Sequence, residues 1–206
     1  MPVEIKPLFR PEVLGQRLKG YALPDSVEQG KTVLLKWAEM ISSGHIDKFN
    51  ETEILHDFLT EVFCDLLGYR RPTDNPEHYT FSREKHIQVD GKFADAVIGE
   101  FTPQDRRFLV AVEGKGPRDP LDRPFKGRKM SAVDHGYRYA INLPCDWIVV
   151  TSMRHTRLYY KGCDQYTYEQ FDMERIAADT LELKRCIGRW KIAAGGCRKV
   201  RHRCHE

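Results

Sequence analysis

The sequence predicts an α/β fold with a central mixed sheet, built from an antiparallel hairpin and a parallel crossover, and flanked by helices. Three observations predict it. An amphipathic helical pattern follows Asn50. The stretch "RFLVAVEGK" (Arg107–Lys115) is apolar on both faces, which is typical of a central strand. A further helical pattern then separates it from a second wholly apolar stretch, "DWIVVTSM" (146–153), so a helix is expected to join two parallel strands.

The first elements are helical. Residues 1–46 predict irregular structure and one helix over about 27–41. In "NETEILHDFLTEVFCDLLGYRRP" the apolar residues recur at three- and four-residue steps, the period of an amphipathic helix. Asn50 is the expected N-cap, and Glu53 stands at capping-box spacing. Gly68 and Pro72 are expected to end this helix.

Strands and helices then alternate in the order α-β-β-β-α-β-β-α. "VDGK" (Val89–Lys92) has the Asp-Gly pair of a tight hairpin turn, and residues 100–107 form a polar loop. The strands are expected at 81–89, 92–98, 107–115, 146–153 and, as the last strand, 156–162; helices are expected within 126–143 and over 173–187.

Length and composition predict a cytoplasmic protein with one domain of ordinary size. The 206 residues are 41% hydrophobic, enough to bury a core. No apolar run reaches the roughly 18 residues of a membrane span, and the start lacks the pattern of a signal peptide. Cys64 and Cys145 are expected to be reduced core residues.

The charge is uneven along the chain. Residues 188–206 hold six Lys or Arg and one acid, although the net charge of the chain is only +3. We therefore divide the sequence into a helical extension (1–47), a main domain (48–187) and a basic tail (188–206). The tail has three interpretations: a nucleic-acid-binding segment, a truncated or frame-shifted end, which we favour, or a metal cluster of Cys197, His202, Cys204 and His205.

Charged residues in two of the expected strands predict chemistry. Glu113 and Lys115 are two residues apart on a strand, so their side chains leave the same face. Asp95 lies within the apolar run "KFADAVI" of the preceding strand. If these strands pair, the two carboxylates converge, repel each other and favour a divalent cation. Mg²⁺ suits such a pair, and Lys115 could neutralise charge on a phosphate beside it.

This ordered pattern resembles the PD-(D/E)xK nuclease superfamily, and more narrowly the N-terminal nuclease domain of type I and type IIG restriction enzymes. The resemblance rests on five stretches: "NETEILHDFLTEVFCDLLGY", "KFADAVI", "VAVEGKGPRDPLDRP", "SAVDHGYRYA" and "CDWIVVTSMRHTRLYYKG". It implies a restriction-endonuclease-like core in which Asp95 and Glu113 are metal ligands and Lys115 is the catalytic lysine. The implied cofactor is Mg²⁺, for which Mn²⁺ can substitute.

The family also implies an acid on the first helix. Glu53 fits best, with Glu51 and Glu61 as rivals; the alternative role of Glu53 is to cap its helix. The family's Gln-x-x-x-Tyr pair corresponds here to His135 and Tyr139, so His replaces Gln. The resemblance implies that both residues contact DNA, where His135 could bind a phosphate or a water. Ala94 stands where the family has Pro.

The loop after Lys115 predicts contact with nucleic acid. Its cations, Arg118, Arg123, Lys126, Arg128 and Lys129, would hold the phosphate backbone of DNA without reading its sequence. The resemblance implies a Mg²⁺-dependent DNA endonuclease domain of a restriction-modification system, with methyltransferase and specificity functions on domains or subunits outside this chain, and a transient dimer. The alternatives are a catalytically silent DNA-binding or assembly module and a repair or recombination nuclease.

Overall fold

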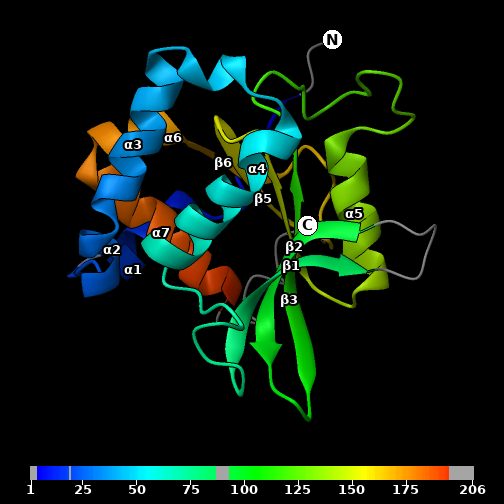
Figure 1. The fold of residues 1–206 in the computed structure, drawn as a ribbon. Coiled ribbons are helices and arrows are strands. Elements are labelled where there is room, and N and C mark those ends of the chain that lie inside the picture. Colours follow the sequence, from blue (N-terminus) through cyan, green and yellow to red (C-terminus); the bar gives the residue numbers. More distant parts are fainter. Residues whose placement is uncertain (1–3, 19, 87–92, 195–206) are drawn as a thin grey trace.

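The computed structural model describes residues 4–18, 20–86 and 93–194, and every statement below concerns these residues. Their strands form one mixed sheet, and helices lie on both sides of it (Figure 1). The strands are β1 (Tyr79–His86), β2 (Phe93–Phe101), β3 (Arg106–Gly114), β4 (Trp147–Thr151), β5 (His155–Tyr160) and β6 (Tyr168–Asp172). The α-helices are α1 (Pro11–Leu18), α2 (Asp25–Gln29), α3 (Lys31–Ser42), α4 (Glu51–Thr60), α5 (Ala132–Asn142), α6 (Met173–Ala178) and α7 (Thr180–Ala194).

The sheet has its strands in sequence order, β1-β2-β3-β4-β5-β6. Strands β3 and β4 are parallel, with α5 as the crossover between them, and the other neighbours are antiparallel. The predicted mixed α/β sheet with flanking helices is therefore confirmed. So is the central position of β3, whose inner residues Val110 to Val112 are fully buried.

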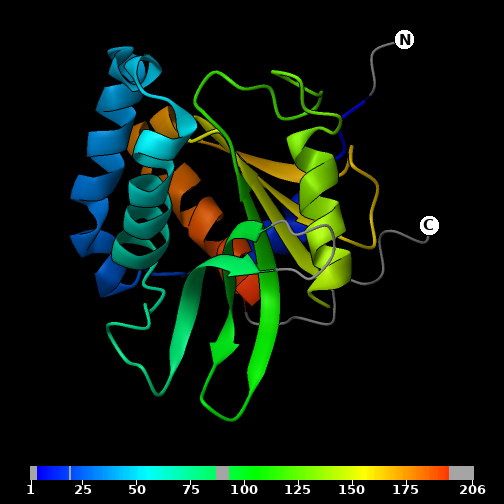
Figure 2. The ribbon, with the colours of Figure 1, turned by 45° about the vertical axis from the view of Figure 1, so that its right-hand side comes forward.

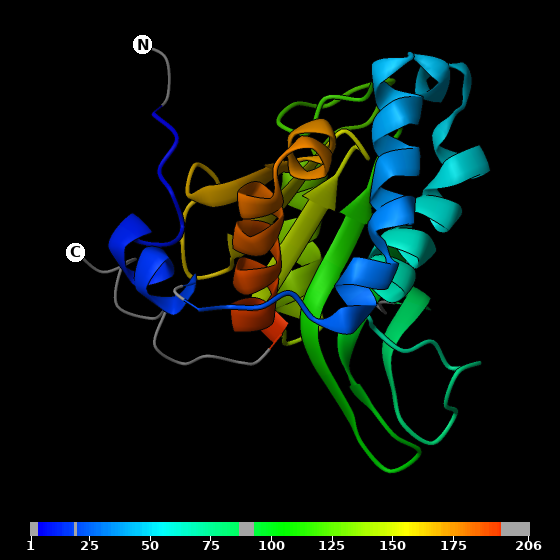
Figure 3. The ribbon, with the colours of Figure 1, turned by 90° about the vertical axis from the view of Figure 1, so that its left-hand side faces the viewer.

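Two hydrophobic layers cover the sheet. On one face, α3, α4, α6 and α7 pack on a cluster that includes Val112 and Val149. On the other face, α5 packs on a cluster that includes Ala111 and Ile148. Figure 2 shows the sheet between α5 and the larger helical layer, and Figure 3 shows that layer facing the viewer, in front of the sheet. Neighbouring residues of β3 thus point into different layers, as the alternation along a strand requires.

The N-terminal extension packs on the main domain. Leu8, Val27, Trp37 and Ile46 belong to the same buried cluster as the sheet residues. Lys6 forms a parallel β-bridge with Thr167, and the backbone N–H of Phe9 donates a hydrogen bond of 2.9 Å to Glu169. The described residues of this extension are therefore held to β6 as well as to the helices.

The helical layer differs from the expectation at several points. The predicted helix over 27–41 is interrupted at Gly30, where a Cβ atom would lie only 2.6 Å from the Cα of Leu66. The first long helix continues from α4 into a π-helix, η2 (Glu61–Leu66), and a 3₁₀ turn, η1 (His45–Lys48), precedes it. The helix predicted over 173–187 is two helices, because Asp179 has an extended backbone, and α7 runs on to Ala194.

Strand boundaries also required correction. The stretch over 156–162 was expected to be the last strand, but β6 follows it. The polar loop is shorter than 100–107, since Glu100 and Phe101 end β2 and Arg106 and Arg107 begin β3. The turn Val89–Lys92 lies outside the described residues, as do Cys197, His202, Cys204 and His205.

Two smaller expectations concern cysteines and membrane spans. Cys64 and Cys145 are free and buried, as predicted. Over the described ranges, no helix has the length and apolar character needed to cross a bilayer.

Candidate active site at the end of the central strand

The acids Asp95 and Glu113 meet on neighbouring strands. The register pairs Ala96 of β2 with Val112 of β3, and one step further along both strands sets Asp95 opposite Glu113. Side chains opposite each other on an antiparallel pair share a face of the sheet. Here that face is the one covered by α5, because Ala111, two residues before Glu113, packs in the α5 layer.

A β-bulge fixes this register. Ile98 pairs with Val110, but Gly99 pairs with Phe108, so Leu109 is the additional residue on β3. Gly99 is required there, because a Cβ atom would lie 2.0 Å from the carbonyl oxygen of Arg107. A slip of one residue would turn Glu113 to the other face, so the bulge helps to determine where the acid points.

Glu113 and Lys115 form a buried ion pair at the end of β3. Their relative exposures are 2% and 6%, and Lys115 Nζ lies 2.5 Å from Glu113 Oε1. The same ammonium donates a hydrogen bond of 2.7 Å to the carbonyl of Gly114. The backbone N–H of Lys115 donates to Thr151, which fixes the residue beside β4. Each buried charge therefore has a partner, as its burial requires.

Asp95 is the acid whose ionisation is most disturbed. Burial, followed by the negative charge of Glu113, raises the pKa of Asp95 to about 7, although Lys115 and the hydrogen bond from Gly114 oppose the shift. That hydrogen bond joins Gly114 N to Asp95 Oδ2 at 2.7 Å. Desolvated acids that repel each other favour a bound cation.

Two of the candidate acids, Glu51 and Glu53, lie in α4, and it is Glu51 that reaches this cluster. Glu51 Oε1 lies 3.8 Å from Lys115 Nζ. Glu53 instead completes the capping box of α4, accepting a hydrogen bond of 2.6 Å from the backbone N–H of Asn50. Glu61 belongs to a different contact, where it accepts hydrogen bonds from Lys36 and the indole of Trp37.

Helix α5 brings His135 and Tyr139 to the acids. Ser131 and Asp134 form the capping box that begins this helix, and His135 and Tyr139 follow one turn apart. His135 Nδ1 lies 3.4 Å from Glu113 Oε1. Burial, and then the charges of Glu113 and Asp95, raises the pKa of the Tyr139 hydroxyl. Gly136 lets the helix approach β4, since a Cβ atom there would lie 2.7 Å from Ile148.

The basic loop is split between surface and site. The side chains of Arg118, Arg123, Lys126 and Lys129 are exposed. Arg128 is half-buried and forms ion pairs with Glu51 and with Asp119, a buried acid that the sequence did not single out. An acid in a Pro- and Gly-rich loop gives no periodic signal, so only the fold reveals its burial.

The residues at the end of β3 fit a magnesium ion. In the described part of the chain, no three His, Cys, Asp or Glu side chains are already grouped as a metal site. Mg²⁺, however, is commonly held by one or two carboxylates, with water and substrate phosphate completing its shell. The mutually repelling carboxylates of Asp95, which is half-buried, and Glu113, which is buried, match that donor set.

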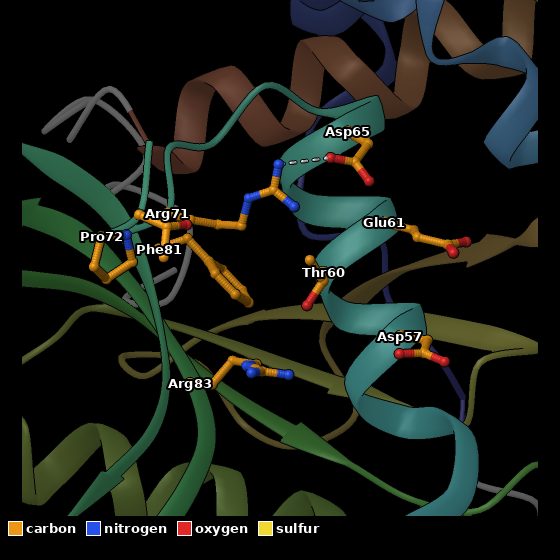
Figure 4. Close-up of a pocket in the computed structure, with 9 residues that line it drawn as sticks. Asp57, Thr60, Glu61, Asp65, Arg71, Pro72, Phe81 and Arg83 are labelled. Carbon is orange, nitrogen blue, oxygen red and sulfur yellow. Dashed lines mark ion pairs between the residues drawn. The ribbon is translucent and has the colours of Figure 1, made fainter. Parts of the chain in front are cut away.

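A separate groove of about 750 Å³ lies between the α4–η2 helix and β1 (Figure 4). Asp57, Thr60 and Asp65 line its helical wall, and Arg71 and Arg83 lie across from them. Asp65 and Arg71 form an ion pair of 3.3 Å within it. The residues that line this groove are distinct from those at the end of β3.

Comparisons of the chain with protein-family models, curated proteins and solved structures found no match. A function must therefore be inferred from the side chains of the site itself.

Proposed function

We propose that this chain is a Mg²⁺-dependent endodeoxyribonuclease domain of a restriction-modification system, built on a restriction-endonuclease-like core. One observation carries the proposal. Two adjacent strands deliver the carboxylates of Asp95 and Glu113 and the ammonium of Lys115 to the same end of the sheet. This is the arrangement that the acid-acid-lysine pattern of the sequence predicts for hydrolysis of a phosphodiester.

Each residue has a distinct role in this proposal. Asp95 and Glu113 would hold the ion, which when bound would stabilise the negative charge that develops on the phosphate. Lys115 would move from Glu113 toward the phosphate and help to neutralise it. Its present partner is Glu113, whose Oε1 lies 2.5 Å from Lys115 Nζ. A cation bound by that carboxylate would therefore release the lysine for substrate.

The exposed cations of the loop supply the contact with DNA. Arg118, Arg123, Lys126 and Lys129 lie on the surface of the segment that follows Lys115. Contacts of this kind hold the phosphate backbone and carry no sequence information. Methylation and sequence recognition would therefore reside on other domains or subunits, and cutting both strands would need two copies of this domain to meet.

Cleavage of supercoiled plasmid in Mg²⁺ tests the proposal. Asp95→Asn, Glu113→Gln and Lys115→Ala should each abolish cleavage, whereas Gln104→Ala, at the exposed tip of the β2–β3 loop, should cut like the unchanged protein. Cleavage that survives all three changes would rule the proposal out. Wild-type protein that binds DNA but neither binds Mg²⁺ nor cuts would be a silent module, and a preference for ends or branches would indicate a repair nuclease.

A further inference from the structure

Arg128 connects α4 to the loop that follows β3, the strand that carries Glu113. Its Nη2 lies 2.9 Å from Glu51 Oε2, and its Nη1 lies 3.1 Å from Asp119 Oδ2. The two carboxylates come from segments far apart in the sequence. A planar guanidinium with two forked donors can join them in a fixed geometry, which a lysine cannot do.

Asp119 is placed for this contact by the backbone around it. Its side chain is only 4% exposed, although it carries a charge. A turn from Gly116 positions it, with a hydrogen bond of 2.9 Å from Asp119 N to the Gly116 carbonyl. Gly116 in turn lies beside Glu51, because a Cβ atom on Gly116 would be 3.6 Å from both the Asp119 carboxylate and the Glu51 backbone nitrogen.

A second turn places two cations of the loop, Lys126 and Arg128, beside the Asp119 carboxylate. Arg128 N donates to the Phe125 carbonyl across a turn whose central residues, Lys126 and Gly127, have φ of 51° and 77°. Such a conformation is unfavourable for Lys126, which has a side chain. Lys126 Nζ lies 3.3 Å from Asp119, but this lysine is 63% exposed. The side chain of Arg128 is only 33% exposed, so solvent screens its ion pair with Asp119 less than it screens that of Lys126.

The contact of Arg128 with both carboxylates also orients Glu51. Arg128 donates a hydrogen bond to Oε2 of Glu51, and the other oxygen, Oε1, lies 3.8 Å from Lys115 Nζ. Burial opposes the charge of Arg128, but Glu51, Asp119 and Glu113 outweigh it and raise the pKa of Arg128. Arginine keeps its positive charge in proteins, so the guanidinium is a cation in direct contact with Glu51.

We propose that Asp119 and Arg128 are positioning residues that hold Glu51 beside Lys115, from where it joins Asp95 and Glu113 as a third acidic group once a divalent cation binds. Without an ion, the described acids are not yet grouped as a metal site. This inference rests on the proposed function and deepens it. It also gives Arg128 a role different from that of the exposed loop cations, which would contact DNA. A residue that orients a metal ligand affects metal binding, whereas a phosphate contact affects DNA binding.

Mn²⁺ binding without DNA, measured by calorimetry, tests the inference, and cleavage kinetics provide the second measurement. Arg128→Ala, Asp119→Asn and Glu51→Gln should each weaken Mn²⁺ binding by about 10- to 100-fold. They should lower kcat while leaving KM for DNA nearly unchanged. Arg128→Lys, which keeps the charge without the fork, should recover only part of the loss. Arg118→Ala, the matched control, should raise KM and leave Mn²⁺ affinity unchanged.

A double-mutant cycle separates positioning from general support of the fold. Once Glu51→Gln is present, Arg128→Ala should cause little further loss of Mn²⁺ affinity, because both changes remove the same contact. Additive losses, or a rise in KM with kcat and Mn²⁺ affinity intact, would overturn the inference while leaving the proposed function standing. Wild-type protein that neither binds Mn²⁺ nor cuts DNA would overturn both.

Discussion

The backbone N–H of Gly114 donates a hydrogen bond of 2.7 Å to Oδ2 of Asp95. The contact joins the acid of β2 to the residue that stands between Glu113 and Lys115. It holds Asp95 beside a second carboxylate instead of letting it turn to solvent. The stabilisation from one hydrogen bond is smaller than the effects of burial and of Glu113, so the pKa of Asp95 is raised to about 7 rather than lowered.

Replacing Asp95 by Asn should therefore stabilise the metal-free fold at high pH. The folded acid keeps its proton up to a pKa of about 7, against 3.8 for the ordinary group. The folded state thus binds more protons between these values, and its stability falls as pH rises through them. At pH 8 in chelator, the free energy of unfolding in urea should be larger for Asp95→Asn than for the unchanged protein by on the order of 4 kcal/mol. The difference should disappear by about pH 4.

Divalent metal should narrow that difference. A ligand that binds only the folded state, present at a concentration of 100 times its Kd, stabilises that state by about 2.7 kcal/mol. For a chain of this length, such a gain corresponds to a rise in Tm of roughly 5 to 10 °C. Mn²⁺ should raise the Tm of the unchanged protein at pH 8 and have little effect on Asp95→Asn. Equal shifts in both proteins would mean that the ion binds elsewhere.

The sheet could be predicted from the sequence because its inner strands carry a strong signal. Residues 110–112 and 147–150 are apolar on both faces, and the structure buries all of them. β6 was missed because "YEQFD" mixes Glu and Gln with its aromatics, and the buried carboxylate of its Glu169 has Phe9 and Arg189, distant in sequence, as partners. Such tertiary partners leave no local pattern.

Mutations of the two acids in the first turn of α4, Glu51 and Glu53, should have different effects on stability and cleavage. Glu53→Ala removes half of the capping box and should cost about 1 kcal/mol of stability while leaving cleavage intact. Glu51→Gln should have the opposite profile, with near-normal unfolding and reduced cleavage. Thermal melts and plasmid nicking, run on both variants, check this. Loss of cleavage in Glu53→Ala, with α4 still folded, would return the catalytic role to that residue.

The choice between these acids illustrates the limit of sequence reasoning at the site. Asp95, Glu113 and Lys115 could be proposed as site residues from the sequence because charges inside apolar strands are unusual. Glu51 and Glu53 both begin the same helix, and spacing alone favours whichever completes a capping box. Only the packing of Gly116 and Arg128 against the start of α4 turns Glu51 inward.

The bulge at Gly99 should be intolerant of a side chain. A Cβ atom there would overlap the Arg107 carbonyl at 2.0 Å, and backbone on both strands would have to shift. Gly99→Ala should therefore destabilise the fold by more than about 3 kcal/mol. Gly15→Ala is the control, because it lies within α1 with no atom within 4 Å of the added Cβ. That change should be neutral or stabilise by up to about 1 kcal/mol.

Glu51 enters the site from one helical layer, while His135 approaches Glu113 from the other. During refolding, a species that has docked only α4 or only α5 would lack part of the cluster, however complete its sheet. Recovery of Mn²⁺ affinity after dilution from denaturant should accordingly lag behind the far-ultraviolet signal of secondary structure. The lag would time the last docking step of this chain.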